Sequence, residues 1–362
     1  MHLTIDVREA CRPKRAGKGQ WTFHFVSELL ERDIGLTLLS DSPLPSRWQT
    51  KMGAQHGPER RSALLTQRGI GWHWAAAKYV RAATGSDLYV SPTSYIVPRL
   101  LGTHVPFVPV VHDLIAFRDE QHDRKARLIE QLTLRKTAEN AAHVCTVSRS
   151  TTLDLLARFP DLPRTKVTPV FAGPTFEITG RNQSDGKTIL SIGTLSPRKN
   201  QLRLIEAFSK LPEALRSQHR LVLVGGRGWN DAPIIAAAKK TENVEWREYL
   251  PDDECTKLLM HSVILAFPSL YEGFGMPVLD ALRAGLPVLT SDRGSLKEIA
   301  GEAAAYCDPE DVSSMAAGLE RLLSDAALRQ TIVEEGLQRA DDFSWPKTVD
   351  LFLESIKKIT PP

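Results

Sequence analysis

The sequence is poor in cysteine and has no long apolar run. Its four cysteines, Cys11, Cys145, Cys255 and Cys307, are far apart and form no CxxC pair, so neither a disulfide framework nor a cysteine-based zinc site is expected. No stretch approaches the roughly 18 consecutive apolar residues that span a bilayer. The opening residues, MHLTIDVREACRPKR, lack the apolar core of a signal peptide. We therefore expect a protein of the reducing cytoplasm.

Several sequence motifs that are typical of particular enzyme classes are also missing. The chain has no GxxxxGK[ST] phosphate loop, no HExxH and no GxSxG, which argues against P-loop nucleotide hydrolysis, zinc proteolysis and serine hydrolysis. The 10 histidines do not cluster at the spacing of metal ligands, and no metal or cofactor is expected. There is no internal repeat of 20–50 residues.

Aromatic and basic residues are interleaved in residues 68–81, RGIGWHWAAAKYVR. This alone is a poor indication of nucleic-acid binding, and no nucleic-acid partner is expected. The segment fits an amphipathic helix whose Trp72, Trp74 and Tyr79, beside Lys78 and Arg81, touch a lipid interface. Packing of the same aromatic stripe into a protein core is the favoured interpretation.

What the chain does contain is the composition of a folded protein of two domains. It has 362 residues, 42% hydrophobic and 25% charged. The net charge of +3 is unevenly distributed: residues 1–180 hold 24 Lys and Arg against 17 Asp and Glu, and the rest hold 22 against 26. The basic half fits an anionic partner, such as a membrane surface or a phosphate-bearing acceptor, and fits ordinary variation of surface charge equally well.

Short apolar, β-branched runs alternate with helical stretches along the whole chain, which predicts an α/β protein with doubly wound parallel sheets. The runs are LTIDV, IGLTLLS, DLYVS, FVPVVHD, HVCTVS and KVTPVF, then TILSIGT, RLVLVGG, NVEWREYL, SVILAFPS, LPVLTS and AAAYCD. The polar segment 177–186, EITGRNQSDG, divides them and is predicted to be a linker. We therefore expect domains at 1–176 and 187–345, with a final helix in 346–362 that crosses back to the first domain. Ligands of such sheets bind at the carboxyl ends of the strands, and two such domains facing one another would leave a central cleft.

The most informative segment is FPSLYEGFGMPVLDALRAGLPV, residues 267–288. It reads as an apolar strand, then Glu272, a glycine-rich turn, Pro277 at the first helical position and Asp280 within the helix. Gly273 and Gly275 allow close approach of a ligand, and the first N–H groups of the helix point into the turn. Amide donors together with two carboxylates suit a sugar attached to a phosphate. Taken alone, the turn is equally well explained as a connection between a strand and a helix that binds no ligand.

A second segment, SIGTLSPRKNQLRLIEAF, places adjacent cations close to a helix N-terminus. The strand ends at Gly193, and the helix is expected to start near Asn200 or Gln201, directly after Arg198 and Lys199. The helix dipole disfavours cations there, whereas an anion held between them and the N–H groups would reverse that effect. A diphosphate fits this arrangement, and two solvated loop cations are the alternative.

Two weaker candidates lie in the first half. Gly17-Lys18-Gly19-Gln20-Trp21 follows the first expected strand and precedes the helical stretch TFHFVSELLER, but it lacks full GxGxxG spacing. It is interpreted as a turn on which a diphosphate could rest. His112-Asp113 ends the run FVPVVHD at the sheet edge. His112 is either a site residue or a satisfied core histidine, and Asp113 either orients it or caps the next helix.

With these residues in place, the chain resembles the family 4 retaining glycosyltransferases of the GT-B fold. The pieces that carry the resemblance are SIGTLSPRKN, RLVLVGGRGW, FPSLYEGFGMPVLDALRAGLPVLTSDRGSLKEIAG and the closing FSWPKT; GKGQW, VVHD and TVSRST match more loosely. The resemblance implies two Rossmann-like domains, an acceptor-side domain first and a nucleotide-sugar-binding domain second.

The resemblance also implies roles for individual residues. Arg198 and Lys199 would bind the donor diphosphate and stabilise the leaving nucleoside diphosphate. Glu272 would face the sugar hydroxyls, with the backbone of Gly273, Phe274, Gly275 and Met276 lining sugar and phosphate. Asp280 stands where the family usually has Glu, and would contact the ribose hydroxyls with a side chain shorter by one methylene.

The remaining implied contacts come from four other places in the chain. Gly193 ends the strand before the cationic turn, and the segment with Tyr249 and Leu250 would face the base. Gly19 would approach the diphosphate from the opposite domain, and His112 would contact the transferred sugar near the reaction centre.

The function that the resemblance implies is metal-independent, retaining transfer of a hexose from a nucleotide sugar to a glycan or lipid-linked acceptor. Mannose from GDP-mannose is favoured, in bacterial polysaccharide or lipopolysaccharide synthesis, because LVGGRGW and VVHD look most like bacterial mannosyltransferases. A UDP-sugar donor, a nucleotide-sugar epimerase and a non-catalytic sugar-nucleotide-binding protein are the alternatives. The expected place is the cytoplasm, with peripheral contact to the inner face of the plasma membrane through the basic first domain.

Overall fold

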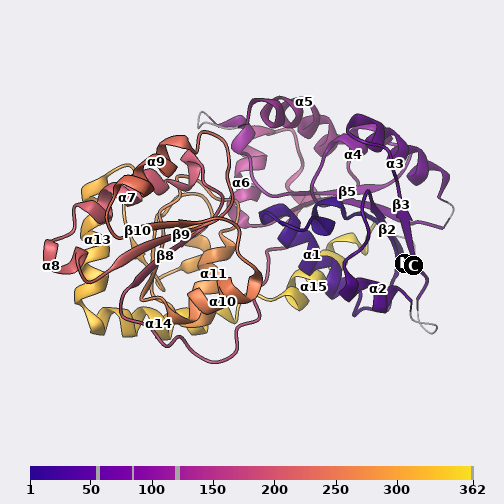
Figure 1. The fold of residues 1–362 in the computed structure, drawn as a ribbon. Helices are drawn as coiled ribbons and strands as arrows, with labels where there is room; N and C mark the ends of the chain where they lie inside the picture. Colours follow the sequence, from indigo (N-terminus) through magenta and orange to yellow (C-terminus); the bar gives the residue numbers. More distant parts are fainter. Residues whose placement is uncertain (54–57, 84, 119–122, 360–362) are drawn as a thin grey trace. The chain divides into compact units, whose positions relative to one another are not determined.

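The computed structural model describes residues 1–53, 58–83, 85–118 and 123–359. The chain forms two compact units. The first contains Met1–Phe117, Arg124–Ala172 and the C-terminal segment that begins at Trp345, and the second contains Gly173–Ser344 with Arg118 and Asp123. Each unit is a parallel β-sheet covered by helices (Figure 1), which confirms the predicted fold class.

The sheet of the first unit has the strand order β3-β2-β1-β4-β5-β6-β7 over the described residues, and its strand pairs are parallel. The apolar runs predicted every one of these strands except β3. That strand, RRSAL, lies at the sheet edge and carries mostly exposed or half-buried side chains, so it lacks the apolar run of a strand buried on both faces. The strands are β1 (His2–Asp6), β2 (Gly35–Ser40), β3 (Arg60–Leu64), β4 (Leu88–Ser91), β5 (Phe107–Val111), β6 (Val144–Thr146) and β7 (Val167–Pro169).

The helices of the first unit form two layers, one on each face of its sheet. The strand order changes direction between β3 and β4, so right-handed crossovers place α1 and α2 on one face and the helices from α3 to α6 on the other. The bounds are η1 (Arg8–Cys11), α1 (Gly17–Leu29), α2 (Ser46–Met52), α3 (Ile70–Ala82), α4 (Ile96–Leu101), η2 (Ile115–Phe117), α5 (Arg124–Asn140), α6 (Arg149–Arg158) and η3 (Arg164–Lys166).

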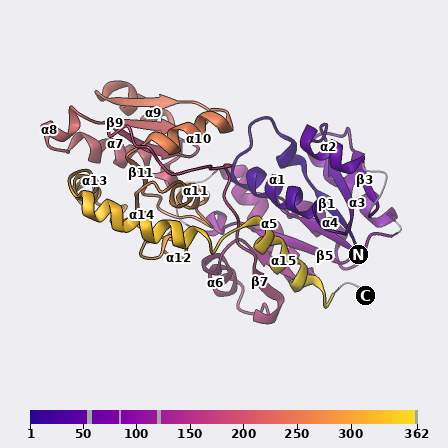
Figure 2. The ribbon, with the colours of Figure 1, turned by 90° about the horizontal axis from the view of Figure 1, so that it is seen from below.

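The C-terminal helix α15 (Trp345–Ile356) belongs to the first unit and lies beside α1 (Figure 2). Phe352 meets Phe25 edge-on with ring centroids 5.0 Å apart, and Trp345 meets Trp21 at 6.1 Å. Both phenylalanines are fully buried. The last helix of the chain therefore completes the core of the unit that contains the first helix.

The second unit has the strand order β10-β9-β8-β11-β12-β13 over its described residues, and all six strands coincide with predicted runs. They are β8 (Thr188–Ile192), β9 (Arg220–Val224), β10 (Val244–Arg247), β11 (Ile264–Phe267), β12 (Val288–Thr290) and β13 (Ala305–Tyr306). The helices are η4 (Pro197–Lys199), α7 (Gln201–Ser209), α8 (Glu213–Arg216), α9 (Ala232–Lys240), α10 (Asp252–His261), α11 (Met276–Ala284), α12 (Leu296–Ala300), α13 (Val312–Ser324) and α14 (Ala326–Ala340). In the described parts of the chain, no helix combines the length and the apolarity that crossing a membrane requires.

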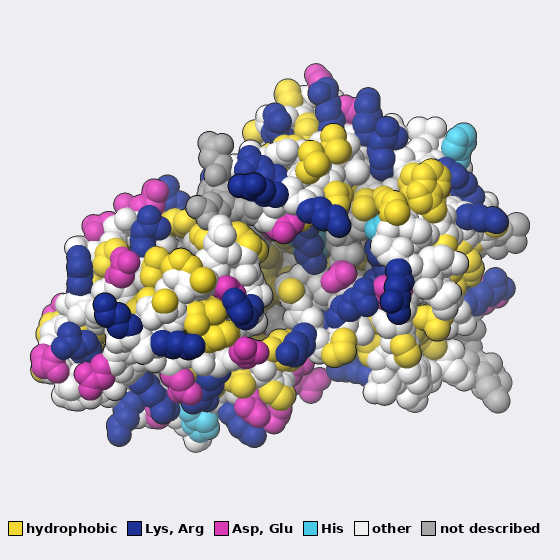
Figure 3. All heavy atoms as spheres, turned by 45° about the horizontal axis from the view of Figure 1, so that its top comes forward, with side chains coloured by type: hydrophobic (Ala, Val, Ile, Leu, Met, Phe, Trp, Pro, Cys, Tyr) yellow, Lys and Arg dark blue, Asp and Glu magenta, His cyan; other side chains and the backbone are white. Residues whose placement is uncertain are grey.

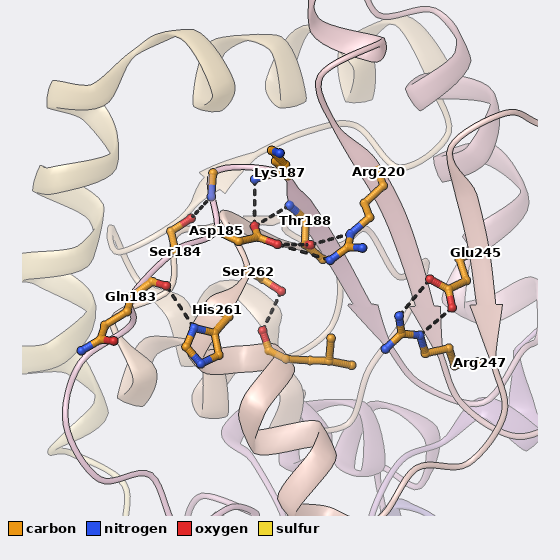
Figure 4. Close-up of polar contacts among 12 residues, drawn as sticks. Gln183, Ser184, Asp185, Lys187, Thr188, Arg220, Glu245, Arg247, His261 and Ser262 are labelled. Atoms are coloured by element: carbon orange, nitrogen blue, oxygen red, sulfur yellow. Dashed lines mark hydrogen bonds and ion pairs between the residues drawn. The ribbon is translucent and has the colours of Figure 1, made fainter.

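The polar segment 177–186 is not a free linker, which corrects the prediction. Its backbone is bound to the second unit: the N–H of Asn182 donates to the carbonyl of Ala284 at 2.8 Å, and that of Gln183 donates to Met260 at 2.7 Å. The Asp185 carboxylate accepts the N–H of Lys187 and the hydroxyl of Thr188 (Figure 4). Its polar side chains satisfy backbone groups at the start of β8. The boundary between the units therefore lies at 172–173.

Candidate active site

The turn that contains Arg198 and Lys199 follows β8. It is hydrogen-bonded to the loop that follows the neighbouring strand β11. Asn200 takes the left-handed conformation, with φ 63°, between η4 and α7. Its side-chain amide donates to the carbonyls of Pro268 at 3.1 Å and Pro309 at 2.6 Å, and the N–H of Leu270 donates to the carbonyl of Arg198 at 2.8 Å. These bonds fix Arg198 and Lys199 in the turn directly before α7, as predicted from the sequence.

The glycine-rich turn after β11 has an equally defined shape. Gly275 has φ 96° and caps α11, which begins at Met276, so Pro277 is the second helical residue and not the first. The carbonyl of Glu272 accepts both the N–H and the hydroxyl of Ser295, each at 3.1 Å. A Cβ on Gly294 would lie 2.4 Å from that same carbonyl oxygen, so only glycine allows the loop before α12 to pack this closely.

The two turns bring Arg198, Lys199 and Glu272 together in what we term the Glu272 cluster. Arg198 Nη1 lies 2.8 Å from Glu272 Oε2, and Lys199 Nζ lies 2.7 Å from Oε1. Arg198 Nη1 also donates to the carbonyl of Tyr271 at 2.6 Å, and Lys199 Nζ stands 4.6 Å from the centroid of the Phe267 ring. The sequence motifs predicted these three residues as parts of one site, and the structure joins them directly.

The cluster is largely buried and carries a net positive charge. The side chains of Arg198, Lys199 and Glu272 are 15%, 13% and 8% exposed. Burial by itself would raise the pKa of Glu272, but the charges of Arg198 and Lys199 outweigh it and hold the pKa below its ordinary value. Two cations thus share one ionised carboxylate at the start of α7. The surplus positive charge and the helix N-terminus favour binding of an anion.

Asp280 is engaged by the backbone of the segment that opens the second unit. It lies within α11, is 1% exposed, and its Oδ1 accepts the N–H groups of Thr175 at 2.6 Å and Phe176 at 3.4 Å. Burial raises the pKa of Asp280 to about 7, against the opposing effect of these hydrogen bonds. The Asp280 carboxyl group is therefore held by the backbone of its own unit; the ribose contact implied by the resemblance stays a prediction.

The other predicted residues of the second unit lie around these loops. A Cβ on Gly193 would stand 3.3 Å from Lys199 Cε, so the glycine makes room for the lysine stem. Phe274 is buried and packs edge-on against Phe343, with ring centroids 5.8 Å apart. Met276 is half-buried at the start of α11.

Tyr249 and Leu250, the expected base-facing residues, are half-buried and follow the edge strand β10. In the sheet order, β10 is separated from β8 by β9 alone. The carboxyl ends of parallel strands meet at one edge of the sheet, so this loop lies at the same edge as the Glu272 cluster.

Gly19, in the first unit, lies inside a helix and not in a separate turn, because α1 already begins at Gly17. A Cβ on Gly19 would lie 2.6 Å from the carbonyl oxygen of Glu9 in η1. The close approach that glycine permits here is to the chain's own backbone. The neighbouring Lys18 pairs with Glu130 of α5 at 2.9 Å, which holds this helix start against α5.

His112 follows β5 and is a buried, neutral side chain. Its Nε2 lies 2.7 Å from the carbonyl oxygen of Pro92, and because a carbonyl only accepts, the ring hydrogen lies on Nε2. Burial, helped by the charge of Lys18, lowers the pKa of His112 to about 3. Its ring meets Trp21 edge-on at 5.4 Å. Asp113 accepts the N–H of Ile115 at 3.1 Å and so caps η2, one of the two roles expected for it.

Sequence reasoning assigned no role to Asn200 and Ser295, which hold the site loops together. The left-handed conformation of Asn200 directly before a helix is a common use of asparagine, so the RKN triplet contained a usable signal. Ser295 had none, because its partner, the carbonyl of Glu272, lies 23 positions away in the chain.

Comparison of the sequence with known proteins shows which family this site resembles. The profile of the family glycosyl transferases group 1 matches residues 176–339, the part that holds the Glu272 cluster. The O-antigen chain mannosyltransferase B of Escherichia coli is 28% identical over 374 aligned positions, which cover 94% of this chain and 96% of that protein. Residues 176–339 thus carry the sequence signature of the group 1 glycosyltransferases.

Solved structures agree on the fold of this glycosyltransferase. Sucrose-phosphate synthase from Thermosynechococcus elongatus superposes with a TM-score of 0.78 at 16% identity, covering 99% of both chains. Anabaena Alr3699/HepE, solved in complex with UDP-glucose, gives 0.77 at 16% identity, covering 99% of this chain and 100% of that one. At these identities the similarity concerns the fold, which is GT-B as predicted.

Proposed function

We propose that this glycosyltransferase is a metal-independent, retaining mannosyltransferase that uses GDP-mannose and elongates a glycan or lipid-linked acceptor in bacterial polysaccharide or lipopolysaccharide synthesis. The support for mannose is the similarity to the O-antigen chain mannosyltransferase B of Escherichia coli, which extends over nearly the whole of both chains. A structural relative is solved with UDP-glucose, so UDP-sugars are the donors to test against GDP-mannose.

The single observation that carries the proposal is the Glu272 cluster. Cleavage of the bond between the anomeric carbon and the diphosphate oxygen builds negative charge on the leaving group. Arg198 and Lys199, held at the N-terminus of α7 by Glu272 at 2.8 and 2.7 Å, would stabilise that charge in a mostly buried site, where electrostatic stabilisation is strong. Fixed cations there can serve the purpose that a divalent metal serves in other transferases.

Glu272 would have two tasks in this mechanism. An ionised carboxylate has about four acceptor positions, and the two cations occupy one on each oxygen. The remaining positions can accept hydroxyl groups of the donor sugar. The same cations lower the basicity of Glu272, which makes it a poor covalent nucleophile.

Retention is proposed to result from attack on the same face that the diphosphate leaves. The leaving phosphate oxygen would take the proton of the acceptor hydroxyl as the new glycosidic bond forms. His112, neutral and with its Nε2 hydrogen directed to the carbonyl of Pro92, would contact the transferred sugar and not act as the acid or the base.

Donor choice is tested by thermal unfolding in EDTA with GDP, UDP, ADP and their sugars, because a ligand that binds only the folded protein raises Tm. We expect the largest shift with GDP-mannose. Release of GDP with a mannan-type acceptor then measures turnover. A larger shift and faster turnover with a UDP-sugar would refute the mannose assignment, and activity abolished by EDTA and restored by a divalent metal would refute metal independence.

The cationic role is tested by Lys199→Ala. We expect at least a tenfold loss of turnover, since one charge-assisted contact to the transition state is removed, while the unfolding transition persists. Lys210→Ala is the matched control, because Lys210 is exposed at the opposite end of α7. Equal activity of the two variants would remove the cation pair from the mechanism.

The proposed location is the cytoplasmic side of the plasma membrane. A lipid-linked acceptor would keep the reaction at the bilayer, and the excess of basic residues in 1–180 suits a peripheral contact there.

A further inference from the structure

The two helical layers of the first unit differ sharply in charge. Helices α3, α4, α5 and α6 together hold ten Lys or Arg against three Asp or Glu, a net charge of +7. Helices α1, α2 and α15, on the other face of the same sheet, hold four against three, a net charge of +1. The basic character of the N-terminal half is therefore concentrated in one helical layer.

The same layer carries large apolar side chains that point to solvent. Ile70 and Trp74 of α3 are 63% and 57% exposed, Leu128 and Leu132 of α5 are 56% and 68%, and Leu153 of α6 is 57%. Among the described residues of α1, α2 and α15, no large hydrophobic side chain is exposed to this degree. Exposed cations and exposed apolar groups thus occur on the same side of the first unit.

On α5 the two kinds of side chain are interleaved. Arg124, Leu128, Leu132 and Arg135 lie three or four positions apart and so share one stripe of the helix. The buried residues Leu134, Thr137 and Ala138 face the other way, toward the core of the unit. Lys125 and Lys136 flank the exposed leucines. Glu139, the acid near the end of this stripe, pairs with Arg135 and Lys136.

Helix α3 repeats the arrangement. Ile70, Trp74 and Lys78 follow one another at intervals of four, with Arg81 on the same side. Trp72 is 1% exposed and belongs to the core, and the half-buried Tyr79 packs against that core, so Trp74 is the member of the aromatic stripe that lies at the surface. Helix α4, which contacts both α3 and α5, adds Arg99. Figure 3 shows apolar side chains among Lys and Arg on this part of the surface.

We propose that the outer layer of the first unit, helices α3 to α6, is a docking surface for an anionic lipid bilayer, with Trp74, Leu128 and Leu132 inserted between headgroups and the surrounding cations on the lipid phosphates. Separate apolar side chains, each surrounded by cations, match the pattern of interfacial helices, and the layer's charge of +7 complements an anionic leaflet. The residues of this surface belong to the first unit and the Glu272 cluster belongs to the second, and vesicle binding is measured without any sugar donor, so the test does not depend on the sugar assignment.

The experiment is co-flotation of the full-length protein with two kinds of vesicle. One contains phosphatidylcholine alone, and the other contains phosphatidylcholine with roughly one lipid in three replaced by phosphatidylglycerol. We expect binding to the anionic vesicles, which weakens strongly between about 0.1 and 1 M salt as the Debye length shrinks from about 10 to 3 Å. Equal binding to both vesicle types, or no binding to either, would refute the proposal.

Variants locate the surface. Leu128→Gln/Leu132→Gln and Lys125→Gln/Lys136→Gln should each lower the partition coefficient at least about tenfold, the second by about 30-fold if each cation contributes ~1 kcal/mol. Arg47→Gln/Lys347→Gln on α2 and α15 is the matched control and should bind as the wild type does. Turnover with a soluble acceptor confirms that every variant is folded.

Two outcomes would assign the surface differently. If the α5 variants float with anionic vesicles as well as the wild type does, the layer is not the docking surface. If light scattering shows that the wild type forms dimers, that the α5 variants are monomers, and that none binds vesicles, the surface joins two copies of the chain and the bilayer proposal fails.

Discussion

The buried carboxyl group of Asp280 makes a specific prediction about stability and pH. Its Oδ1 accepts two backbone N–H groups, and burial raises its pKa from 3.8 to about 7. In the unfolded chain the group ionises near pH 4, so between pH 4 and 7 the folded protein binds more protons than the unfolded one. Its contribution to the free energy of unfolding therefore falls as pH rises, and levels off above the folded-state pKa.

The full effect of this rise in pKa is about 4 kcal/mol, of which about 2.5 kcal/mol develops between pH 5 and pH 8. Asp280→Asn keeps an oxygen that can accept the two N–H groups but cannot ionise. We therefore expect its free energy of unfolding, relative to wild type, to increase by about 2–3 kcal/mol from pH 5 to pH 8. Urea unfolding at both pH values, followed by circular dichroism, measures the difference.

Asp253→Asn provides the control, because this α10 side chain is 70% exposed and its replacement tests the loss of a negative charge alone. A stability difference between Asp280→Asn and wild type that stays within ~0.5 kcal/mol across this range would show that the carboxyl group is not buried as described. The reasoning about Asp280 would then be wrong, whatever its role toward the donor.

Three further perturbations test the site and the core. Glu272→Gln removes the carboxylate that Arg198 and Lys199 share, so turnover should fall at least tenfold while the Tm shift with GDP grows, because the cluster becomes more positive; a smaller shift would contradict this balance of charges. Gly19→Ala should cost about 1–3 kcal/mol in urea unfolding, since its Cβ would lie 2.6 Å from the carbonyl oxygen of Glu9, whereas Gly53→Ala, with its nearest neighbour at 3.6 Å, should cost less. Phe352→Ala, fully buried on α15, should cost about 3–5 kcal/mol; a cost below 1 kcal/mol would mean that the last helix is not part of the first unit's core.

The architecture was predictable because strands buried on both faces leave an apolar run in the sequence. Every strand of the described chain except β3 coincides with such a run. Helix boundaries were less accessible. The start of α1 at Gly17 was missed, because glycine is a poor helix former and the packing of Gly19 on Glu9 depends on η1. Helices α13 and α14 are divided at Asp325, whose side chain caps α14 by accepting the N–H of Leu328.

The sequence by itself determined the local parts of the site. A pair of cations before a helix, and an acid beside a glycine-rich turn, are features of neighbouring residues, and dihedral preferences and helix ends act over the same short range. Only the tertiary structure decided that Glu272 binds Lys199 and Arg198 from 73 and 74 positions away, and that Asp280 binds the backbone of Thr175 from 105 positions away. Those contacts arise from strand order and loop packing. The contacts of Glu272 exist because β8 and β11 are neighbours in the sheet, which no local pattern of residues records.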